Sequence, residues 1–419
     1  MAQRGITEYD AKRMLATAIE GYNGEVVLLG PGEDLESKVA DNPWLKSKKL
    51  VAKPDQLFGK RGKNGLIFLG DNLESTAKWI SEKMNKKTTL LSGVTGTLTH
   101  FLVEPMTPHK SEYYVAMKAG EAGDTIFLSA AGGINVEENW DKVTEICVST
   151  LSKLDEELLR SRVSEICTQN EEDAPAVIKF ITQLWGLYQK GGFVYLEINP
   201  FTVVNGVGIP LDCVAKVDDT AEFECKELWG EIDFPPPFGQ ELSKEELYVK
   251  KLDAMSGASL KLRLLNPEGR VWNMVAGGGA SVIYADTVAD LGGGKDLAMY
   301  GEYSGDPSTQ LTYEYAKTVM ELMTRKPDPK GRTKVLLIGG GIANFTDVAK
   351  TFTGIIMAME EFAAKLKAVN ARIYVRRGGP NYKVGLSKIR SAAEKLKLPI
   401  KVYGPETHMT EIVRLALSE

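Results

Sequence analysis

The feature that most constrains this 419-residue chain is a run of three prolines, Phe234-Pro-Pro-Pro-Phe238. Each proline lacks a backbone N–H and fixes φ, so neither a helix nor a central strand continues through the run. The chain is long enough for two or three domains, each with a core of ordinary size. We therefore expect a domain boundary near residue 240, with domains at 1–240 and 241–419.

The part before this boundary mixes strand-like and helix-like runs. The runs that predict strands are Lys49–Lys53, Leu66–Leu69, Phe101–Glu104, Tyr113–Met117, Thr125–Ser129, Phe193–Ile198 and Ile209–Val214. The patterns that predict helices are Tyr9–Ala18, Glu74–Met84, Trp140–Ser152 and Ala174–Leu187. This mixture indicates an α+β domain.

After the boundary the pattern becomes regular. The predicted strands are Val271–Ala276, Lys334–Ile338, Arg372–Arg376 and Ile400–Tyr403, and each leads through a loop into a helical pattern. The helix after the second strand has an apolar stripe, which predicts that it faces a core, at Val348, Phe352, Ile355, Met359, Phe362 and Leu366. This βαβ alternation predicts an α/β domain with a doubly wound parallel sheet of Rossmann-like or flavodoxin-like type.

Composition and charge exclude several classes of protein. The formal net charge is −5, whereas nucleic acids and anionic membrane surfaces favour a basic face, so we expect neither as a partner. The four cysteines show no C-x-x-C spacing and no paired histidines, which argues against a zinc site or a disulfide framework. We expect reduced thiols, a cytoplasmic location, no signal peptide and no membrane span.

A glycine-rich loop with three cations, Gly59-Lys-Arg-Gly-Lys-Asn-Gly65, lies between two predicted strands. Such a loop is able to close over phosphates. It is not a Walker A loop, because the spacing G-x-x-x-x-G-K-[ST] is absent and no helix follows. A basic hairpin tip is about as often only solvated surface, so the loop alone leaves both interpretations open.

A hairpin in the same half predicts a metal site. Asn205-Gly206 between apolar runs is a strong signal for a two-residue turn, and this turn places Asn199 opposite Asp212. Glu197 lies two residues before Asn199 and therefore shares its face. Magnesium is commonly held by one or two carboxylates together with substrate phosphates. The alternative is a polar strand end in which a bulge breaks the register; we favour the metal.

In the second half, three predicted strands end in glycine-rich loops. These loops are Ala276-Gly-Gly-Gly-Ala-Ser281, Gly339-Gly-Gly-Ile-Ala-Asn-Phe-Thr346 and Arg376-Arg-Gly-Gly-Pro-Asn381. Ligands of open parallel sheets bind beyond the carboxyl ends of the strands. Asn344 or Thr346 offers a side chain beside the free N–H groups of a helix start, and Arg377 offers a planar fork for a carboxylate. We therefore expect an anion there.

Two alternatives apply to these loops. A dinucleotide fold is disfavoured, because Asn344 stands where G-x-G-x-x-G needs its third glycine and no acidic residue closes a second strand about 20 residues later. The simpler alternative is that Asn344 and Thr346 only cap the following helix, a role compatible with ligand binding.

Histidine, a usual carrier of transferred phosphate, occurs only three times, at His100, His109 and His408. None of the three lies in a glycine-flanked loop. His109 and His408 are better explained as residues that hold loops together. We therefore assign no phosphohistidine to this chain.

Several longer motifs carry a family resemblance. They are Lys53-Pro-Asp-Gln, Gly59-Lys-Arg-Gly-Lys63, Val103-Glu-Pro-Met106, Glu197-Ile-Asn-Pro200, Phe234-Pro-Pro-Pro-Phe-Gly239, Met274-Val-Ala-Gly-Gly-Gly-Ala-Ser-Val-Ile-Tyr-Ala-Asp286, Gly301-Glu-Tyr-Ser-Gly305, Gly340-Gly-Ile-Ala-Asn-Phe-Thr346 and Val375-Arg-Arg-Gly-Gly-Pro-Asn-Tyr382. Over nearly its whole length the chain resembles the ATP-citrate lyase family. It is similar to the smaller subunit of the two-chain type, which is equivalent to the N-terminal part of the single-chain animal enzyme.

The resemblance implies an ATP-grasp domain related to the succinyl-CoA synthetase β chain, followed by a citrate-binding α/β domain. It implies that ATP is contacted by Lys53, Arg61, Gly62, Pro105, Thr107 and Glu112, and Mg²⁺ by Asn199 and Asp212. It implies a second cation-binding stretch at Asp253, Ser256 and Ala258, and citrate contacts at Gly305, Asn344, Thr346 and Arg377. One position departs from the animal pattern, because Phe362 stands where that pattern has a tyrosine that touches citrate.

The resemblance also implies a partner. In the family a larger subunit carries the phosphohistidine, the coenzyme A site and a citrate-synthase-like module, and the hetero-oligomer converts citrate, CoA and ATP into acetyl-CoA, oxaloacetate, ADP and phosphate. The alternatives are a subunit of a separate citryl-CoA synthetase, a succinyl-CoA-type ligase subunit, which we rank well below, and a non-catalytic sensor of citrate and ATP.

Overall fold

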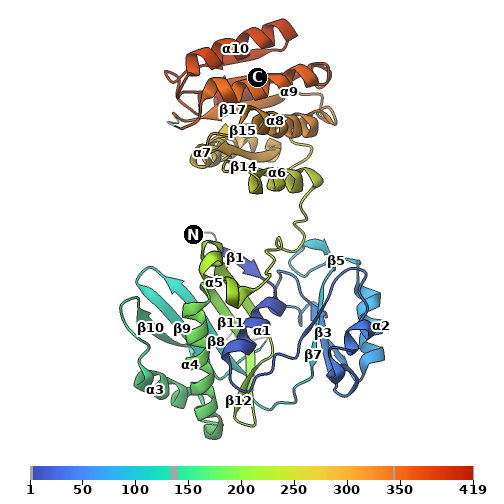
Figure 1. Ribbon diagram of the computed structural model, residues 1–419, viewed down its shortest axis with the longest axis vertical. Coiled ribbons are helices and arrows are strands. Elements are labelled where there is room, and N and C mark those ends of the chain that lie inside the picture. Colours follow the sequence, from blue (N-terminus) through green and yellow to red (C-terminus); the bar gives the residue numbers. More distant parts are fainter. Residues whose placement is uncertain (1–2, 134–139, 343–344, 419) are drawn as a thin grey trace. The chain divides into compact units, whose positions relative to one another are not determined.

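The computed structural model describes residues 3–133, 140–342 and 345–418. The chain forms two compact units, residues 1–241 and 242–419, and each is described by itself (Figure 1). None of the described helices combines the length and the apolarity needed to cross a membrane.

The first unit contains a large and a small antiparallel sheet. The strands are β1 Gln3–Ile6, β2 Val27–Leu29, β3 Leu50–Pro54, β4 Phe68–Gly70, β5 Lys87–Thr89, β6 Thr95–Thr97, β7 Phe101–Pro105, β8 Tyr113–Gly120, β9 Gly123–Ser129, β10 Thr144–Ser149, β11 Phe193–Val204, β12 Val207–Pro210 and β13 Cys213–Asp218. The large sheet has the order β1-β13-β11-β8-β9-β10, with β12 paired to β11. The small sheet has the order β2-β7-β3-β4, and β5 and β6 form a separate ribbon.

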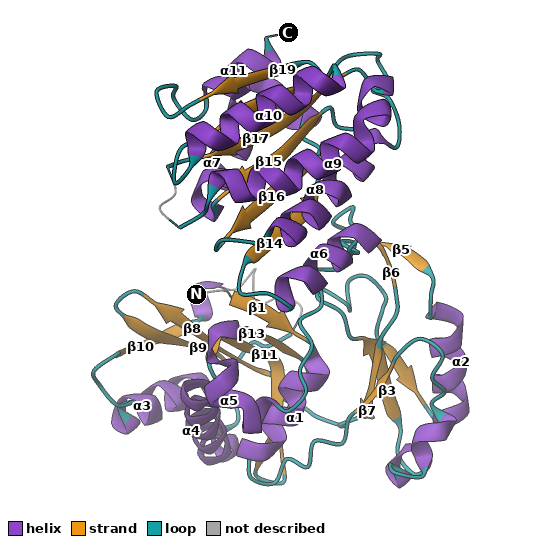
Figure 2. Cartoon of the chain, turned by 45° about the horizontal axis from the view of Figure 1, so that its top comes forward, coloured by secondary structure: helices purple, strands orange, loops and turns teal. Residues whose placement is uncertain are grey.

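Helices cover the outer faces of these sheets. They are α1 Glu8–Ala18, α2 Leu73–Lys83, α3 Glu156–Ile166, α4 Ala174–Lys190 and α5 Glu222–Trp229. In Figure 2, α3 and α4 lie along one face of the large sheet and α2 flanks the small sheet. Alternate residues of β11 explain this packing: Leu196 and Ile198 join the core, whereas Tyr195 and Glu197 point to the opposite face.

The second unit is built around a six-stranded sheet of order β14-β16-β15-β17-β18-β19. Its elements are α6 Lys244–Ala254, β14 Ser259–Leu264, β15 Val271–Ala276, α7 Gly278–Val288, β16 Met299–Ser304, α8 Thr309–Thr324, β17 Lys334–Gly340, α9 Val348–Ala368, β18 Ala371–Arg376, α10 Tyr382–Leu396, β19 Ile400–Tyr403 and α11 Glu411–Leu417. Only β14, at one edge, is antiparallel to its neighbour. Helices α7 and α11 pack on one face, and α6, α8, α9 and α10 pack on the other. The predicted doubly wound sheet is therefore present.

Two predictions about elements were wrong. Residues 140–152 were predicted to be a helix, but they contain β10, in which buried Ile146 and Val148 alternate with exposed Glu145 and Cys147. The predicted strand Ile209–Val214 is two strands, β12 and β13, separated at residues 211–212. This separation places Asp212 in a connection instead of within a strand.

Candidate functional site

The first unit contains a cavity of about 1720 Å³. It is lined from both sides, by the inner face of the large sheet and by β3, β7 and the loop between β3 and β4. All the residues predicted to contact ATP or magnesium in this half line it: Lys53, Arg61, Gly62, Pro105, Thr107, Glu112, Asn199 and Asp212. Residues that lie up to about 160 positions apart in the sequence thus line one cavity.

The β3–β4 hairpin brings the glycine-rich loop to this cavity. Leu50 pairs with Gly70 and Ala52 with Phe68, so the predicted arrangement of strand, loop and strand is present. At the rim, the ring of His109 lies 2.7 Å from the carbonyl oxygen of Thr107 and 3.0 Å from Glu112 Oε1. Both ring nitrogens are therefore engaged in holding this loop, as the sequence analysis expected.

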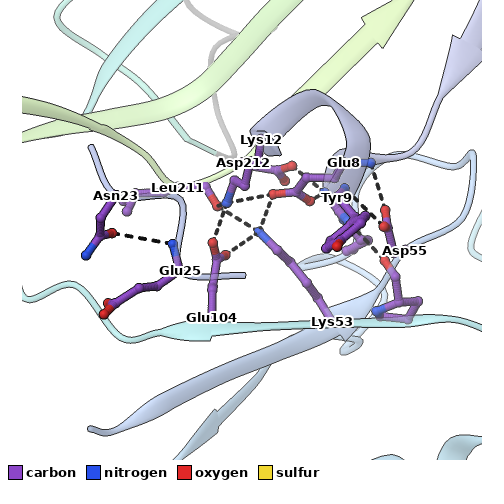
Figure 3. Close-up of polar contacts among 12 residues, drawn as sticks. Glu8, Tyr9, Lys12, Asn23, Glu25, Lys53, Asp55, Glu104, Leu211 and Asp212 are labelled. Atoms are coloured by element: carbon purple, nitrogen blue, oxygen red, sulfur yellow. Dashed lines mark hydrogen bonds and ion pairs between the residues drawn. The ribbon is translucent and has the colours of Figure 1, made fainter. Parts of the chain in front are cut away.

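Six charged side chains at the cavity form one ion-pair network, and all of them except Arg61 are labelled in Figure 3. They are Glu8, Lys12, Lys53, Arg61, Glu104 and Asp212. The Glu8 carboxylate lies 2.8 Å from Lys12 Nζ and 2.7 Å from Lys53 Nζ. It also lies 2.5 Å from Arg61 Nη2. Glu104 contacts the same two lysines, at 2.5 Å and 2.8 Å, so two carboxylates share two ammonium groups.

The start of α1 holds Glu8 in place. Asp55 accepts hydrogen bonds from the backbone N–H groups of Glu8, at 2.8 Å, and Tyr9, at 3.1 Å. Thr7 caps the same helix by accepting from the N–H of Asp10. Asp55 belongs to the motif Lys53-Pro-Asp-Gln, so this motif supplies both a cation for the cavity and a cap for the helix that carries Glu8.

Burial and charge shift the pKa values of this network in opposing directions. Burial alone would raise the pKa of the Glu8 carboxyl, but Arg61 and the two lysines lower it well below its ordinary value. Burial opposes the charge of Lys12, yet Glu104 and Glu8 raise its pKa above the usual one. Burial and the charge of Glu8 raise the pKa of Asp55 to about 6. Opposite charges thus hold Glu8 and Lys12 in their charged forms, whereas burial raises the pKa of Asp55 beside the network and of Asp212 within it.

Glu8, Lys12 and Glu104 were not predicted as site residues from the sequence. A signal was present for two of them. Glu8 and Lys12 are four residues apart on α1 and lie in the same helical stripe as Ala11 and Leu15, which are buried. Charged residues inside an otherwise apolar stripe indicate a buried ion pair or a site.

The hairpin register predicted for the metal site is present. Val204 pairs with Val207 and Phe201 with Pro210, and the N–H of Asn199 donates to the carbonyl oxygen of Asp212 at 3.2 Å. The side chains diverge, however. Asn199 Nδ2 donates to Glu197 at 3.4 Å, whereas the Asp212 carboxylate pairs with Arg61.

The second unit brings its glycine-rich loops together at the carboxyl ends of β15, β17 and β18. The N–H of Gly277 donates to the carbonyl oxygen of Tyr303 at 3.0 Å, and Ile342 forms a bridge with Gly378. The helices that follow the neighbouring strands β15 and β17 lie on opposite faces of the sheet. Such a switch of faces opens the crevice in which α/β sheets bind ligands.

Arg377, which directly follows β18, is fully buried at this end of the sheet. Its Nη1 lies 3.5 Å from the carbonyl oxygen of Gly341, and its Nε and Nη2 have no hydrogen-bond partner among the described residues. The hydroxyl of Tyr303 is likewise buried without a partner in the described part of the chain. A buried charge is stable only when it is paired and hydrogen-bonded. The buried guanidinium of Arg377 is therefore suited to bind an anion.

Two other residues predicted to bind citrate, and the departing position Phe362, have different outcomes. Asn344 lies outside the described residues. Thr346 is buried just before α9, and the N-cap of that helix is Asp347, whose side chain accepts from the N–H of Lys350 at 2.9 Å. Phe362 lies in the core on the fourth turn of α9, about 20 Å along the helix from its start at 1.5 Å per residue.

The predicted second cation stretch lies beside Gly305. A Cβ added to Gly305 would meet Ala258 at 3.3 Å. The Ser256 hydroxyl lies 3.4 Å from the Ala258 carbonyl oxygen and 3.5 Å from that of Asp253. The Asp253 carboxylate is occupied by the N–H of Leu260 and by the ammonium group of Lys261, both at 2.7 Å. The oxygens that converge here therefore belong to one hydroxyl and two backbone carbonyls.

Two family models match the chain. The model described as ATP-citrate synthase ATP-grasp domain matches residues 2–229, and the model described as ATP citrate lyase citrate-binding matches residues 240–419. The predicted ATP-grasp and citrate-binding folds are thereby confirmed.

Similar relatives belong to the same family as these two models. The chain is 45% identical to ATP-citrate synthase alpha chain protein 2 of Arabidopsis thaliana, over its whole length and 98% of that protein. It is 44% identical to human ATP-citrate synthase, of which it covers 38%. The solved structure of ATP citrate lyase from Methanothrix soehngenii in complex with citrate and coenzyme A matches all of both chains, with 52% identity and a TM-score of 0.88. The chain belongs to the ATP-citrate lyase family, as an ATP-grasp and citrate-binding chain.

Proposed function

We propose that this chain binds MgATP in the cavity of its first unit and citrate at the carboxyl ends of β15, β17 and β18, for phosphate transfer and citryl-CoA formation in the ATP-citrate lyase reaction. One observation carries the proposal: the eight residues predicted to hold ATP and magnesium line a single cavity. In it, Lys53 and Arg61 contact the phosphates, Gly62 lets the loop backbone approach, and Glu112 faces the ribose.

Asn199 and Asp212 are our proposed magnesium ligands. An amide oxygen and a carboxylate beside a phosphate site fit magnesium, which is usually held by one or two protein oxygens and by phosphates. Among the described residues, no group of three or more His, Cys, Asp or Glu side chains is arranged to hold a metal, so the phosphates would complete the coordination. Magnesium would neutralise part of the phosphate charge. If Asp212 binds the magnesium ion, its ion pair with Arg61 breaks, and Arg61 can then pair with a phosphate.

Citrate is proposed to pair with Arg377, whose two unpartnered nitrogens fit a carboxylate in bidentate geometry. Thr346 and Gly305 would complete the pocket with Asn344, and the stretch Asp253–Ala258 beside Gly305 would take a second cation. Citrate has three carboxylates and therefore needs more hydrogen-bond donors than a dicarboxylate such as succinate. This set of donors thus fits citrate better.

The histidine that carries phosphate is proposed to lie on a larger partner subunit, with the coenzyme A site and the citrate-synthase-like module. This agrees with the engaged ring of His109 and with the fact that the chain spans 38% of the human relative. We also propose a cytoplasmic location, with which the four free thiols agree. Purifying the native complex tests the partner: a chain with a citrate-synthase-like module indicates a full lyase, and a chain without one a separate citryl-CoA synthetase.

Calorimetric titration of the chain with citrate, succinate and isocitrate tests the citrate site. We expect wild type to select citrate, and Arg377→Ala to weaken citrate binding by at least about a hundredfold, because a buried carboxylate then loses its partner. Arg270→Ala is the matched control, since Arg270 is also buried but directly precedes β15, at the amino ends of the parallel strands and away from the loops at their carboxyl ends. Equal citrate affinity in wild type and Arg377→Ala would overturn the assignment.

A further inference from the structure

Lys12 is the most deeply enclosed cation of the ion-pair network. Its side chain is 0% exposed, and its Nζ contacts Glu8 at 2.8 Å, Glu104 at 2.5 Å and the carbonyl oxygen of Leu211 at 3.1 Å. An ammonium group has three donors, so these three acceptors use all of them. No donor of Lys12 remains for a ligand.

The position of Lys12 separates it from the other members of the network. Lys53 and Arg61 line the cavity, as do the three carboxylates, whereas Lys12 is absent from the lining formed by the described residues. A nucleotide in the cavity therefore reaches Lys53 and Arg61 directly but does not touch Lys12. Figure 3 shows Lys12 on α1, beside Glu104 and Asp212.

The charge balance of the network changes when a polyphosphate binds, and this change makes Lys12 necessary. The network has three cations and three carboxylates. When phosphates attract Lys53 and Arg61, the carboxylate of Glu8 loses two of its three partners while a new anion arrives beside it. A buried carboxylate without a partner is strongly unfavourable, and it would hold Lys53 and Arg61 back from the phosphates.

We propose that Lys12 is a positioning residue for nucleotide binding, which keeps Glu8 and Glu104 paired while a polyphosphate draws the other two cations of the network toward itself. This inference rests on the proposed nucleotide site. Lys12 acts through the two carboxylates and makes no contact with the phosphates. Other titratable groups that face Glu8 are Asp55, Tyr22 and Cys213, and none of them is a cation.

The test is calorimetric titration of the full chain with MgATP at pH 7.5. We expect Lys12→Met to weaken binding by about tenfold or more, because Glu8 then competes with the phosphates for Lys53. Lys334→Met is the matched control, since Lys334 is only 2% exposed but lies in the second unit, where its Nζ donates to the carbonyl oxygen of Met323. The control should stay within about twofold of wild type.

Rescue separates positioning from simple structural support. The double variant Glu8→Gln/Lys12→Met should regain part of the lost affinity, because one of the two carboxylates that need Lys12 is then gone, while Glu104 still keeps Lys53. The proposal is overturned if Lys12→Met binds MgATP like Lys334→Met, or if the double variant binds no better than Lys12→Met. Failure of wild type itself to bind MgATP would instead overturn the proposed nucleotide site.

Proton uptake during MgATP binding to wild type is a second measurement, independent of whether Lys12→Met folds. Titrations in buffers of different ionisation enthalpy should show no proton uptake at pH 7.5, because Lys12 keeps both carboxylates paired in their charged form. Uptake approaching one proton per nucleotide that persists in Asp55→Asn would mean that Glu8 or Glu104 is neutralised by protonation, and this would overturn the role of Lys12.

Discussion

At the scale of single residues, Asp55 makes the stability of the first unit depend on pH. Its pKa is raised to about 6, above that of an aspartate in an unfolded chain, by burial and by the charge of Glu8. A raised carboxyl pKa contributes stability that is full below about pH 4 and lost as the pH rises through about 6. Asp55→Asn removes this titration, and Thr7 then remains as the N-cap of α1.

We predict that the unfolding free energy of wild type, relative to Asp55→Asn, falls by about 3 kcal/mol at most between pH 4 and pH 7. Urea unfolding at a series of pH values measures this difference. Asp328→Asn is the control, because Arg332 lowers the pKa of Asp328 to about 2 and its titration lies below the window. An unchanged difference across the window would show that Asp55 titrates normally.

The residues of the candidate site were predictable to different degrees. Asn199 and Asp212 could be paired from the sequence, because a two-residue turn fixes the register of a hairpin. The partner of Asp212 could not, since Arg61 lies 151 residues away and reaches it only through the packing of two sheets. The role of Asp55 as the cap of a distant helix was hidden for the same reason.

At the scale of elements, the end of β17 controls the position of Arg377. A Cβ added to Gly340 would lie 2.4 Å from Arg377 Nη1, and the φ of Gly340 is +155°. The atom in the way is the tip of a flexible side chain, so Gly340→Ala should displace the guanidinium at a modest cost in stability, about 1–3 kcal/mol. The fold should survive.

We predict that Gly340→Ala weakens citrate binding by about tenfold or more, because it displaces Arg377 Nε and Nη2, which have no hydrogen-bond partner among the described residues, from the proposed citrate site. Calorimetry with citrate measures this loss, and a thermal melt confirms folding. Gly341→Ala is the neighbouring control, since its Cβ would meet nothing within 4 Å. Similar citrate affinity in both variants would exclude a positioning effect of Gly340.

Elements with long periodic patterns were predicted better than short ones. The apolar stripe of α9 runs from Val348 to Leu366, about five turns, and is buried throughout, so only a helix fits it. In residues 140–152, apolar Val143 and Ile146 also stand three positions apart, and this helical spacing concealed the alternation of β10. Strand β14, which closes the second sheet as an antiparallel edge, was missed because βαβ alternation predicts only parallel strands.

At the scale of the whole molecule, the two units have separate cores. The clusters of the first unit contain only residues before the proline run and Phe238, and those of the second begin at Val249. Each unit also carries its own candidate site, the cavity in residues 1–241 and the buried Arg377 at the carboxyl ends of the strands in residues 242–419. A core and a site within the same unit indicate that each unit folds and binds by itself.

We predict that fragments 1–241 and 242–419 unfold cooperatively when produced separately. MgATP should raise the melting temperature of the first fragment only, and citrate that of the second only, because a ligand stabilises the folded state that binds it. Differential scanning calorimetry of both fragments with both ligands measures this, and Arg377→Ala in fragment 242–419 is the control for citrate. If the full chain responds to citrate and fragment 242–419 folds without responding, the citrate pocket needs residues from the first unit, and the assignment of one site to each unit is wrong.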